Sequence, residues 1–313
     1  MTGGAGFIGS HLAQAVAARG NRVLVFDSFD DYYSPAAKRR NLREARASGV
    51  VEAVDGDVCN REQVNRVWAE FRPEVVYHLA ARVGVRASVT DPAGYERVNV
   101  GGTVNVLWSS ADAGVRAIVL ASSSSVYGNG RPPFAEDAPA VSPLSPYAAS
   151  KRAAELFASS FCHLTGLPVT VARLFTAFGP RQRPDLAIHK FVRLMEAGQP
   201  IPLYGDGTSS RDYTYVGDIV DGLVRAASLG TGFGIINLGS GRTVSLRRVV
   251  EVLEEQLGRR ARIEPQPPRP EDPEVTWADV DKARLLLDWT PRVSFEEGVR
   301  LFLDWHSRTQ EAR

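Results

Sequence analysis

The sequence has little of what marks a secreted, membrane-spanning or metal-binding protein. Its 313 residues include only two cysteines, Cys59 and Cys162, which we expect to be reduced and structural. No apolar run approaches the ~20 residues of a membrane span, and the first residues lack the basic segment of a signal peptide. The five histidines show no metal-ligand spacing. The sequence therefore predicts a cytoplasmic protein without a metal.

An excess of charge of one sign is also lacking. The formal net charge is +1, and acidic and basic residues are interspersed along the chain. Nucleic acid and an anionic membrane surface are therefore not expected partners. A chain of this length can bury a large core and form one large domain or two closely joined ones.

Glycine is concentrated at the amino end, where residues 3–9 satisfy both the G-x-x-G-x-x-G and the G-x-G-x-x-G spacing. Such glycines permit a tight turn and close approach of the backbone to a pyrophosphate, which the amino end of a helix over 8–19 would hold. The strand 23–26 ends at Asp27, an acid that hydrogen-bonds the ribose hydroxyls and repels a 2′-phosphate. This segment predicts NAD as the cofactor, bound by Gly3, Gly6, Phe7, Ile8, Gly9 and Asp27.

A strand is missing before this turn, because only Met1 and Thr2 precede Gly3. Without it, the middle of a parallel sheet would lose ladder hydrogen bonds that nothing else supplies. Only four of the 37 basic residues are lysines, which suggests a GC-rich genome, where a GTG valine codon can start translation. We therefore expect residues upstream of Met1 to complete the first strand.

The serine run 122–125 and the segment Tyr147–Lys151 carry the chemistry of an alcohol oxidation. Tyrosine and lysine four residues apart lie on one face of a helix. A phenol ionises near pH ~10, and a neighbouring ammonium is expected to lower that pKa toward the working range of a base. A serine hydroxyl would bind the substrate oxygen that loses its proton. We predict a catalyst that passes hydride from an alcohol to a bound nicotinamide.

Strand-like apolar runs alternate with helical patterns through the first half, which is typical of a doubly wound parallel sheet. We predict an α/β protein with a Rossmann domain over 1–172 and a smaller α/β substrate lobe over 173–313, parts of 212–240 returning to the first domain. The predicted strands are 23–26, 50–54, 75–79, 118–121 and 169–174, and the further helices are 61–71, 95–113, 146–164, 188–197, 217–227, 246–257 and 295–307.

With these motifs the chain resembles the extended short-chain dehydrogenase/reductase family, and within it the nucleotide-sugar 4-epimerases. The resemblance covers nearly the whole length and is carried by the segments 2–10, 125–128, 147–151, 211–213 and 269–272. It implies that Ser123, Tyr147 and Lys151 are catalytic, and that Arg211 and Arg269 bind the nucleotide diphosphate. Glu271 replaces a glycine that is usual in the family. The resemblance also implies cofactor contacts from Asp57, Val58, Leu79, Ala80, Ala81, Asn99, Tyr147 and Lys151.

The two positions after Ser123 bear on the reaction. By the resemblance, Tyr147 takes the C4 hydroxyl proton while NAD accepts the C4 hydride, which gives a 4-keto sugar. Dehydratases that resemble this chain have an Asp-Glu pair after the catalytic residue, and UDP-glucuronate decarboxylases have a glutamate at the second place. Here the two residues are Ser124 and Ser125, and neither hydroxyl is suited to remove water across C5–C6. Return of the hydride to the other face, which is C4 epimerisation, is therefore expected.

The sugar is indicated by Thr176 and the segment 179–185. UDP-glucose 4-epimerases usually have asparagine at the first of these, whereas the threonine with Gly-Pro-Arg-Gln-Arg-Pro-Asp resembles UDP-glucuronate 4-epimerases. By that similarity Thr176, Ser124 and Arg183 would meet the C6 carboxylate. Alternatively, Arg181 and Arg183 merely brace the loop.

Thr276 bears on the alternatives, because it stands where a bulky tyrosine restricts the pocket to unsubstituted sugars. The smaller threonine widens the pocket enough to admit an N-acetyl group, so UDP-N-acetylglucosamine remains an alternative substrate, as does UDP-glucose. A UDP-glucuronate decarboxylase and a non-catalytic NAD sensor are less favoured. The resemblance also implies a homodimer in which the helices 95–113 and 146–164 pair with their copies as a four-helix bundle. The expected substrate-binding residues are Ser124, Ser125, Thr176, Arg183, Arg211, Arg269 and Thr276.

Overall fold

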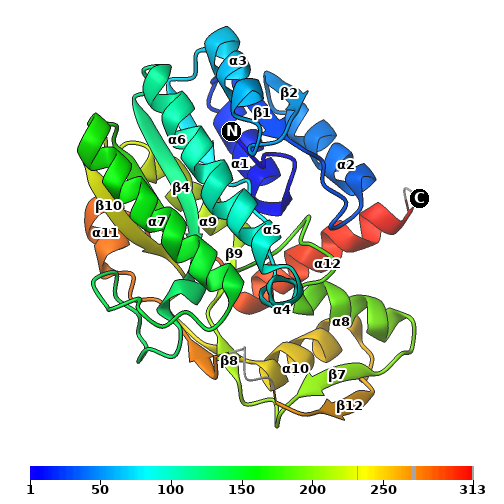
Figure 1. The fold of residues 1–313 in the computed structure, drawn as a ribbon. Helices are drawn as coiled ribbons and strands as arrows, with labels where there is room; N and C mark the ends of the chain where they lie inside the picture. The colour runs from blue at the N-terminus through cyan, green and yellow to red at the C-terminus, as the bar shows by residue number, and fades with distance from the viewer. Residues whose placement is uncertain (231, 269–272, 312–313) are drawn as a thin grey trace.

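Two bodies make up the molecule in the computed structural model, which describes residues 1–230, 232–268 and 273–311. In the larger body helices flank a sheet, and a smaller lobe lies below it (Figure 1). The smaller lobe contains α8 (Ala187–Glu196), β7 (Ile201–Tyr204), α10 (Leu246–Leu257) and β12 (Ile263–Gln266).

A parallel sheet forms the centre of the larger body. Thr2 makes isolated parallel bridges to Phe26 and His78, and so joins two groups of strands into one sheet. All neighbouring strands of the sheet pair in parallel, which confirms the predicted α/β class and doubly wound sheet. Whether upstream residues lengthen the Thr2 bridge stays a prediction. The spatial order is β2 (Val51–Asp55), β1 (Val23–Asp27), Thr2, β3 (Val75–His78), β4 (Ala117–Ser123), β5 (Val169–Leu174) and β10 (Phe233–Leu238).

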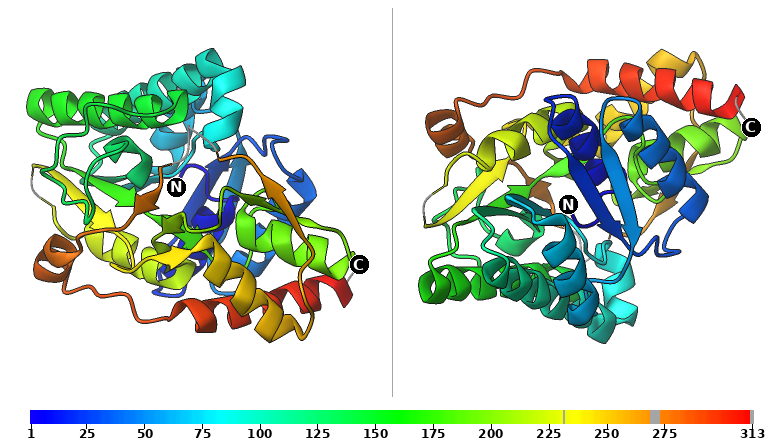
Figure 2. Two further views of the ribbon diagram at one scale, coloured as in Figure 1. Left: turned by 90° about the horizontal axis from the view of Figure 1, so that it is seen from below. Right: turned by 90° about the horizontal axis from the view of Figure 1, so that it is seen from above.

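Helices cover both faces of this sheet (Figure 2). On one face a core that includes Leu12, Val25 and Leu223 is buried, and on the other a core that includes Trp68 and Leu107. The first face is covered by α1 (Phe7–Ala17), α2 (Pro35–Arg46), α9 (Val216–Ala226) and α11 (Asp281–Leu287), and the second by α3 (Arg61–Phe71), α6 (Gly102–Asp112) and α7 (Pro146–Thr165).

Helix α7 has clear start and stop signals. The Ser145 side chain accepts a hydrogen bond from the backbone N–H of Ala148, and Pro146 occupies the first helical position. The helix ends at Gly166, whose φ of 72° is left-handed. These signals place the predicted helix 146–164 within one residue of its observed end.

The predicted helix 95–113 is not uniform. It consists of α5 (Pro92–Glu96), a π-helical turn at Arg97–Gly101 and α6. A π turn widens the helix locally and is frequent at functional sites. Asn99 lies within this turn, which a 3.6-residue period does not predict.

The chain crosses between the two bodies more than once. After the small lobe begins, α9 and β10 return to the larger body, where β10 pairs with β5. The domain boundary at 172/173 stays a prediction. Between the bodies lie the short strand pairs β6 (Thr176–Phe178) with β9 (Tyr213–Tyr215), and β8 (Ser210–Arg211) with β11 (Val244–Ser245) and β13 (Val275–Thr276).

The small lobe has a core of its own. Phe178, Phe191, Leu253 and Phe302 are buried together, and Phe302 belongs to α12 (Phe295–Glu311). The remaining short elements are α4 (Val85–Thr90) and a 3₁₀ turn at Ser124–Tyr127. Within the described ranges, no helix is both long and apolar enough to cross a membrane.

Candidate active site

The glycine turn lies against the end of β3. Gly3 has a φ of +66°, and a Cβ there would lie 2.6 Å from the amide nitrogen of Ala80. A Cβ on Gly9 would lie 2.2 Å from the carbonyl oxygen of Gly3. Only glycine fits these two positions. No side chain caps α1 at Gly6, so the amide groups of its first turn are available to an anion.

Asp27 and Tyr33 lie near this turn. The Asp27 carboxylate accepts hydrogen bonds from the backbone N–H groups of Ala5 at 3.0 Å and Phe29 at 2.9 Å, and burial raises its pKa. The buried Tyr33 hydroxyl has no hydrogen-bond partner among the described residues, and a Cβ on Gly6 would lie 3.9 Å from it. A buried hydroxyl without a partner beside a helix amino end suits a phosphate oxygen. These features fit a dinucleotide. The sequence analysis missed Tyr33 because it lies in a loop, outside the motifs that point to the cofactor.

Asp57 and Val58 follow β2 at the same edge of the sheet. The Asp57 carboxylate accepts the backbone N–H of Cys59 at 2.9 Å. Val58 is buried, and a Cβ on Gly102 of α6 would lie 2.7 Å from its Cγ2. Their backbone is therefore fixed between a strand end and α6, while their contact with the adenine stays a prediction.

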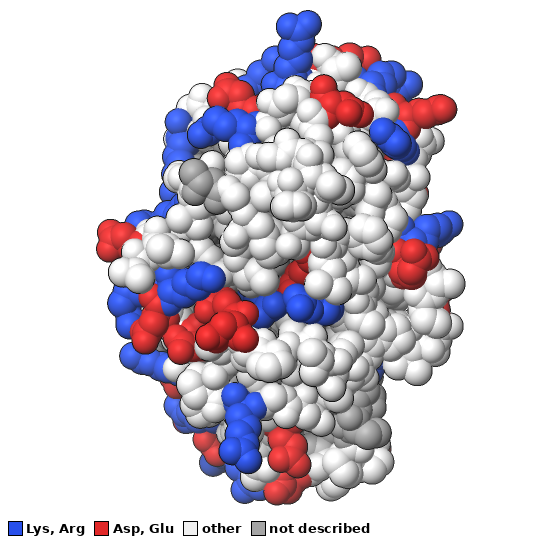
Figure 3. All heavy atoms as spheres, turned by 60° about the vertical axis from the view of Figure 1, so that its left-hand side comes forward, with Lys and Arg blue, Asp and Glu red and all other residues white. Residues whose placement is uncertain are grey.

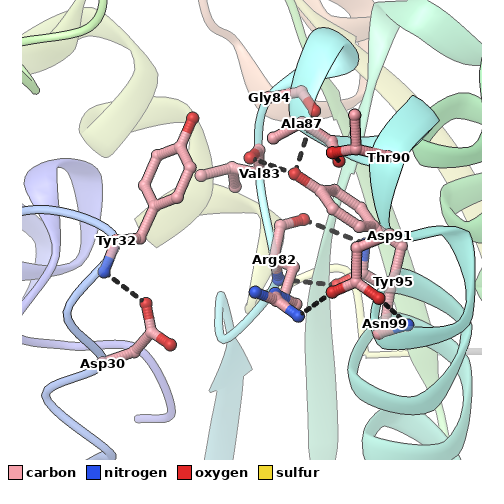
Figure 4. Close-up of polar contacts among 11 residues, drawn as sticks. Asp30, Tyr32, Arg82, Val83, Gly84, Ala87, Thr90, Asp91, Tyr95 and Asn99 are labelled. Atoms are coloured by element: carbon pink, nitrogen blue, oxygen red, sulfur yellow. Dashed lines mark hydrogen bonds and ion pairs between the residues drawn. The ribbon is translucent and has the colours of Figure 1, made fainter.

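Asn99 organises the loop that follows β3 (Figure 4). Its side-chain amide donates to the carbonyl of Arg82 at 3.0 Å and to Ser150 Oγ at 2.9 Å, and its Oδ1 accepts the N–H of Arg82 at 2.7 Å. The Tyr95 hydroxyl bonds two carbonyls of the same loop, at 2.6 and 3.0 Å. Tyr32 faces this loop from across the site. Asn99 is 1% exposed, so its observed contacts hold the loop to α7, and a direct cofactor contact stays a prediction.

Ser123, Tyr147 and Lys151 meet at the carboxyl end of β4. Ser123 is the last residue of that strand, Tyr147 is the second residue of α7, and Lys151 follows one turn later. The Lys151 ammonium donates to the carbonyl of Ala121 at 2.9 Å. The Tyr147 ring packs edge-on against Tyr95, with 6.2 Å between ring centroids, and its phenol interacts with the Ser123 side chain. The structure thus brings the three predicted catalytic residues together, while their roles stay predictions.

The pKa of Tyr147 departs from our expectation. Burial raises it, although the interaction with Ser123 and the charge of Arg183 act in the other direction. Burial also lowers the pKa of Lys151 to about 8, against the opposing effect of Glu155. The prediction that the phenol falls below its ordinary pKa was therefore wrong, because exclusion of water outweighs the effects of Ser123 and Arg183.

Arg183 is the cation whose charge acts to lower the pKa of the Tyr147 phenol. Its Nε and Nη2 each lie 3.0 Å from a carboxylate oxygen of Asp185, and its side chain is 16% exposed. Asp185 in turn accepts a hydrogen bond from the Tyr32 hydroxyl at 3.4 Å. Ser125 Oγ lies 3.1 Å from Ser123 Oγ, at the start of the 3₁₀ turn that also contains Ser124. The Nη1 atom of Arg183 makes no hydrogen bond among the described residues.

Arg181 has a different task from Arg183. It is buried, its Nε lies 2.8 Å from Glu44 of α2, and its Nη2 donates to Gln14 of α1 at 2.6 Å. His11 of α1 also bonds the carbonyl of Pro180, at 2.9 Å. Arg181 therefore braces the loop against the helix that follows the glycine turn, as the alternative interpretation proposed for both arginines.

Three of the expected diphosphate and pocket residues lie on the short strands between the two bodies. Arg211 and Thr276 are register partners in the β8–β13 pair, and Thr276 is buried. The Arg211 Nη1 donates to the carbonyl of Ser210 at 3.0 Å. Thr176 begins β6, and its N–H donates to the carbonyl of Asp212. Arg269 lies outside the described residues.

The sequence profile of the family described as GDP-mannose 4,6 dehydratase matches residues 1–302. The chain belongs to this family. The predicted resemblance to extended short-chain dehydrogenase/reductases of the nucleotide-sugar 4-epimerase type is confirmed by its relatives.

Relatives of this family member include enzymes with a described reaction. It is 40% identical over 312 residues to a UDP-glucuronate 4-epimerase of Thermodesulfobacterium geofontis, which covers 99% of this chain and 96% of the relative. It superposes with a TM-score of 0.92 at 32% identity on the UDP-glucuronic acid 4-epimerase of Bacillus cereus, solved with UDP-glucuronic acid and NAD, over 98% of each chain. The UDP-glucose 4-epimerase of Thermus thermophilus, solved with NAD, gives 0.89 at 35% identity over 98% of this chain and 97% of that one.

Proposed function

We propose that the protein is an NAD-dependent isomerase that interconverts UDP-glucuronate and UDP-galacturonate by epimerisation at C4. The observation that carries the proposal is the arrangement around Tyr147. One phenol is next to Ser123, shares a helix face with Lys151, and lies in the field of Arg183. This arrangement supports a phenol that acts as acid and base and a cation that binds a carboxylate at one site.

The chain's own groups account for proton movement in the reaction. Tyr147 takes the proton of the C4 hydroxyl, and Ser123 hydrogen-bonds the same oxygen as it becomes a carbonyl. Lys151 supplies a positive charge one helical turn from the phenol, which stabilises the phenolate. Bound NAD would supply the acceptor for the C4 hydride and its donor for return to the other face of the 4-keto sugar. The glycine turn, Asp27 and Tyr33 are the groups that would hold the dinucleotide.

The residues after Ser123 favour return of the hydride over further chemistry. Ser124 and Ser125 lie in the 3₁₀ turn next to the catalytic serine, and neither side chain is an acid or base at neutral pH. Elimination of water needs a proton removed at C5 and another delivered to the leaving hydroxyl. Ser124 and Ser125 therefore offer the 4-keto sugar no carboxyl group for elimination, which favours C4 epimerisation.

Arg183 favours the glucuronate among UDP-sugars. Its guanidinium is largely buried, and Asp185 holds it from the Nε side. The substrate carboxylate would meet the Nη1 end, with hydroxyl donors from Ser124, Ser125 and Thr176. Arg211, with Arg269, would bind the diphosphate, and the small Thr276 side chain would line the pocket.

We also propose that the enzyme is a homodimer, paired through α6 and α7. Trp108 of α6 is 42% exposed, and Leu156, Phe157 and Leu164 of α7 are 56%, 45% and 77% exposed. Figure 3 looks toward this side, and its upper half contains a broad area without charged residues. Exposed aromatic and aliphatic side chains on adjacent helices suit a bundle of four helices. A cytoplasmic location stays the prediction made from composition.

The experiment that tests the proposal is proton NMR of UDP-glucuronate incubated with the purified protein, without added NAD. We expect the C4 proton signals to convert to the galacturonate pattern, because NAD is regenerated in each cycle. UDP-N-acetylglucosamine and UDP-glucose are tested in parallel. Conversion of either of these in preference to UDP-glucuronate would contradict the substrate assignment, and net formation of NADH would contradict epimerisation.

A further inference from the structure

A buried carboxylate lies one helical turn beyond the catalytic lysine. Glu155 of α7 is 0% exposed, and every contact of its carboxylate is with a donor. Arg173 of β5 donates to both oxygens, from Nε at 3.0 Å and Nη2 at 2.8 Å, and Arg152 donates to Oε2 at 2.9 Å. Ser122 Oγ donates to Oε1 at 2.5 Å. Burial of a carboxylate costs free energy, which four hydrogen-bond donors only partly offset, so a role for this charge is expected.

What Glu155 organises is the junction between α7 and β4. Ser122 is the residue before Ser123, so its bond to Glu155 holds the strand one position from the catalytic hydroxyl. On the other side, Lys151 bonds the carbonyl of Ala121 at 2.9 Å. Two side chains from successive turns of α7 thus bracket the end of β4. Slippage of the helix along the strand would break both bonds, and would move Tyr147 relative to Ser123.

Glu155 is also the negative charge that acts on Lys151. Burial lowers the pKa of Lys151 to about 8, and Glu155 opposes that effect. Two other titratable groups lie in this region: His78 of β3, on which the Lys151 charge acts and whose pKa is lowered to about 3, and Tyr147, one helical turn before Lys151, whose pKa burial raises. The α-amino group of Met1 also acts on His78, and burial lowers its own pKa to about 5. None of these is an anion at neutral pH.

We propose that Glu155 is a positioning residue of the active site, which fixes α7 against the end of β4 and keeps the Lys151 ammonium charged beside Tyr147. Arg173 of β5 neutralises the Glu155 carboxylate through its two hydrogen bonds. Its guanidinium also lies over the Tyr127 ring, 4.6 Å from the ring centroid. The residue's role in turnover rests on the proposed epimerase function, whereas its effect on Lys151 does not.

A lysine titration tests the charge directly. The chain has four lysines, so the 13C-labelled Cε signals resolve into few resonances, and the Lys151 signal is assigned by its absence from Lys151→Met. We expect the Lys151 midpoint near pH 8 in the wild type. In Glu155→Gln it should fall by roughly one pH unit or more, as for loss of an adjacent opposite charge. The matched control is Arg152→Gln, which removes a cation from the same carboxylate and should leave the midpoint in place or raise it.

Glu155→Gln strands the buried Arg173 guanidinium and could fail to fold. Glu155→Gln/Arg173→Met removes both charges, and replacing a whole buried pair is often neutral for stability. The double variant should fold, and its Lys151 midpoint should lie below that of Arg173→Met, because these two variants differ only in the Glu155 charge. Equal midpoints in folded Arg173→Met and the folded double variant would overturn the proposal.

Turnover of whichever UDP-sugar the wild type epimerises gives the second readout. The alkaline half-activity pH should fall together with the NMR midpoint in the Glu155 variants. Ser122→Ala should lower kcat roughly tenfold at pH 6.5 without moving the alkaline half-activity pH, because it removes only the hydrogen bond that holds β4 to α7. Full kcat in Ser122→Ala would contradict the positioning half of the proposal. A wild type inactive on every UDP-sugar would count against the proposed function alone, since the lysine titration would still decide the role of Glu155.

Discussion

Replacement of Arg183 with glutamine separates recognition of the C6 carboxylate from the general chemistry of the site. The side chain is 16% exposed and is held on one side by two 3.0 Å contacts with Asp185. Hydrogen bonds between charged partners contribute about 1.5–3 kcal/mol each when one is lost. We assign about 3 kcal/mol to the contact between the substrate carboxylate and the Nη1 end of Arg183. We assign no more than this because solvent near the guanidinium weakens the pair.

That free energy corresponds to a fall of about 100-fold in kcat/KM for UDP-glucuronate relative to UDP-glucose. The ratio matters, because Arg183 also lowers the pKa of Tyr147. Its loss would raise that pKa further and reduce kcat for every sugar alike. Dividing the two values of kcat/KM removes this common effect.

Two companion variants sharpen the assay. In Arg183→Gln the Asp185 carboxylate stays without its cation near the incoming substrate carboxylate, so Arg183→Gln/Asp185→Asn should recover several-fold of the lost preference. Arg183→Lys keeps a charge but not the planar donor pair, and should fall between the wild type and Arg183→Gln. Equal losses of kcat/KM for UDP-glucuronate and UDP-glucose in Arg183→Gln would refute the assignment of Arg183 to the carboxylate.

Further predictions concern the phenol, the loop, the products and the assembly. Tyr147→Phe should lower kcat about 10³-fold while bound NAD, measured after denaturation, stays at the wild-type level; turnover within tenfold of wild type would contradict its role as acid/base. Arg181→Met should reduce the free energy of unfolding by about 2 kcal/mol in guanidinium titration, because it breaks a partly buried ion pair. Because Ser125 replaces the glutamate of decarboxylases, UDP-pentose should stay a minor product by NMR, and an appreciable pentose signal would count against this reasoning. Trp108→Glu/Phe157→Glu should convert a dimer to a monomer in light scattering, whereas an unchanged mass would exclude pairing through α6 and α7.

Much of the fold and part of the site could be predicted from the sequence, because those features depend on local chemistry. Glycine spacing identifies a turn that only glycine can adopt, because a Cβ at Gly3 or Gly9 would clash with neighbouring backbone atoms. The alternation of apolar strands and helices identifies a parallel sheet. The spacing of Tyr147 and Lys151 on a helix, with a start signal at Ser145, likewise follows from the helical period.

Other features could not be predicted, because they depend on segments that meet only in the folded chain. The direction of the Tyr147 pKa reflects a balance of burial against a serine from β4 and an arginine from a distant loop. The sequence analysis predicted a substrate role for Arg183 and left open that Arg181 and Arg183 both brace the loop, whereas the two arginines bond different carboxylates, Glu44 and Asp185. No local pattern distinguishes the two, since both are basic residues in one loop.

The sequence by itself therefore determined the doubly wound sheet and the dinucleotide turn, since each depends on local spacing and residue type, and it predicted Ser123, Tyr147 and Lys151 as the catalytic residues. Only the tertiary structure decided which charges neighbour one another: Glu155 with Arg173 and Ser122, and Arg183 with Asp185. The physical reason is that electrostatic effects in a protein depend on distance and on exclusion of water, and both are set by packing between elements.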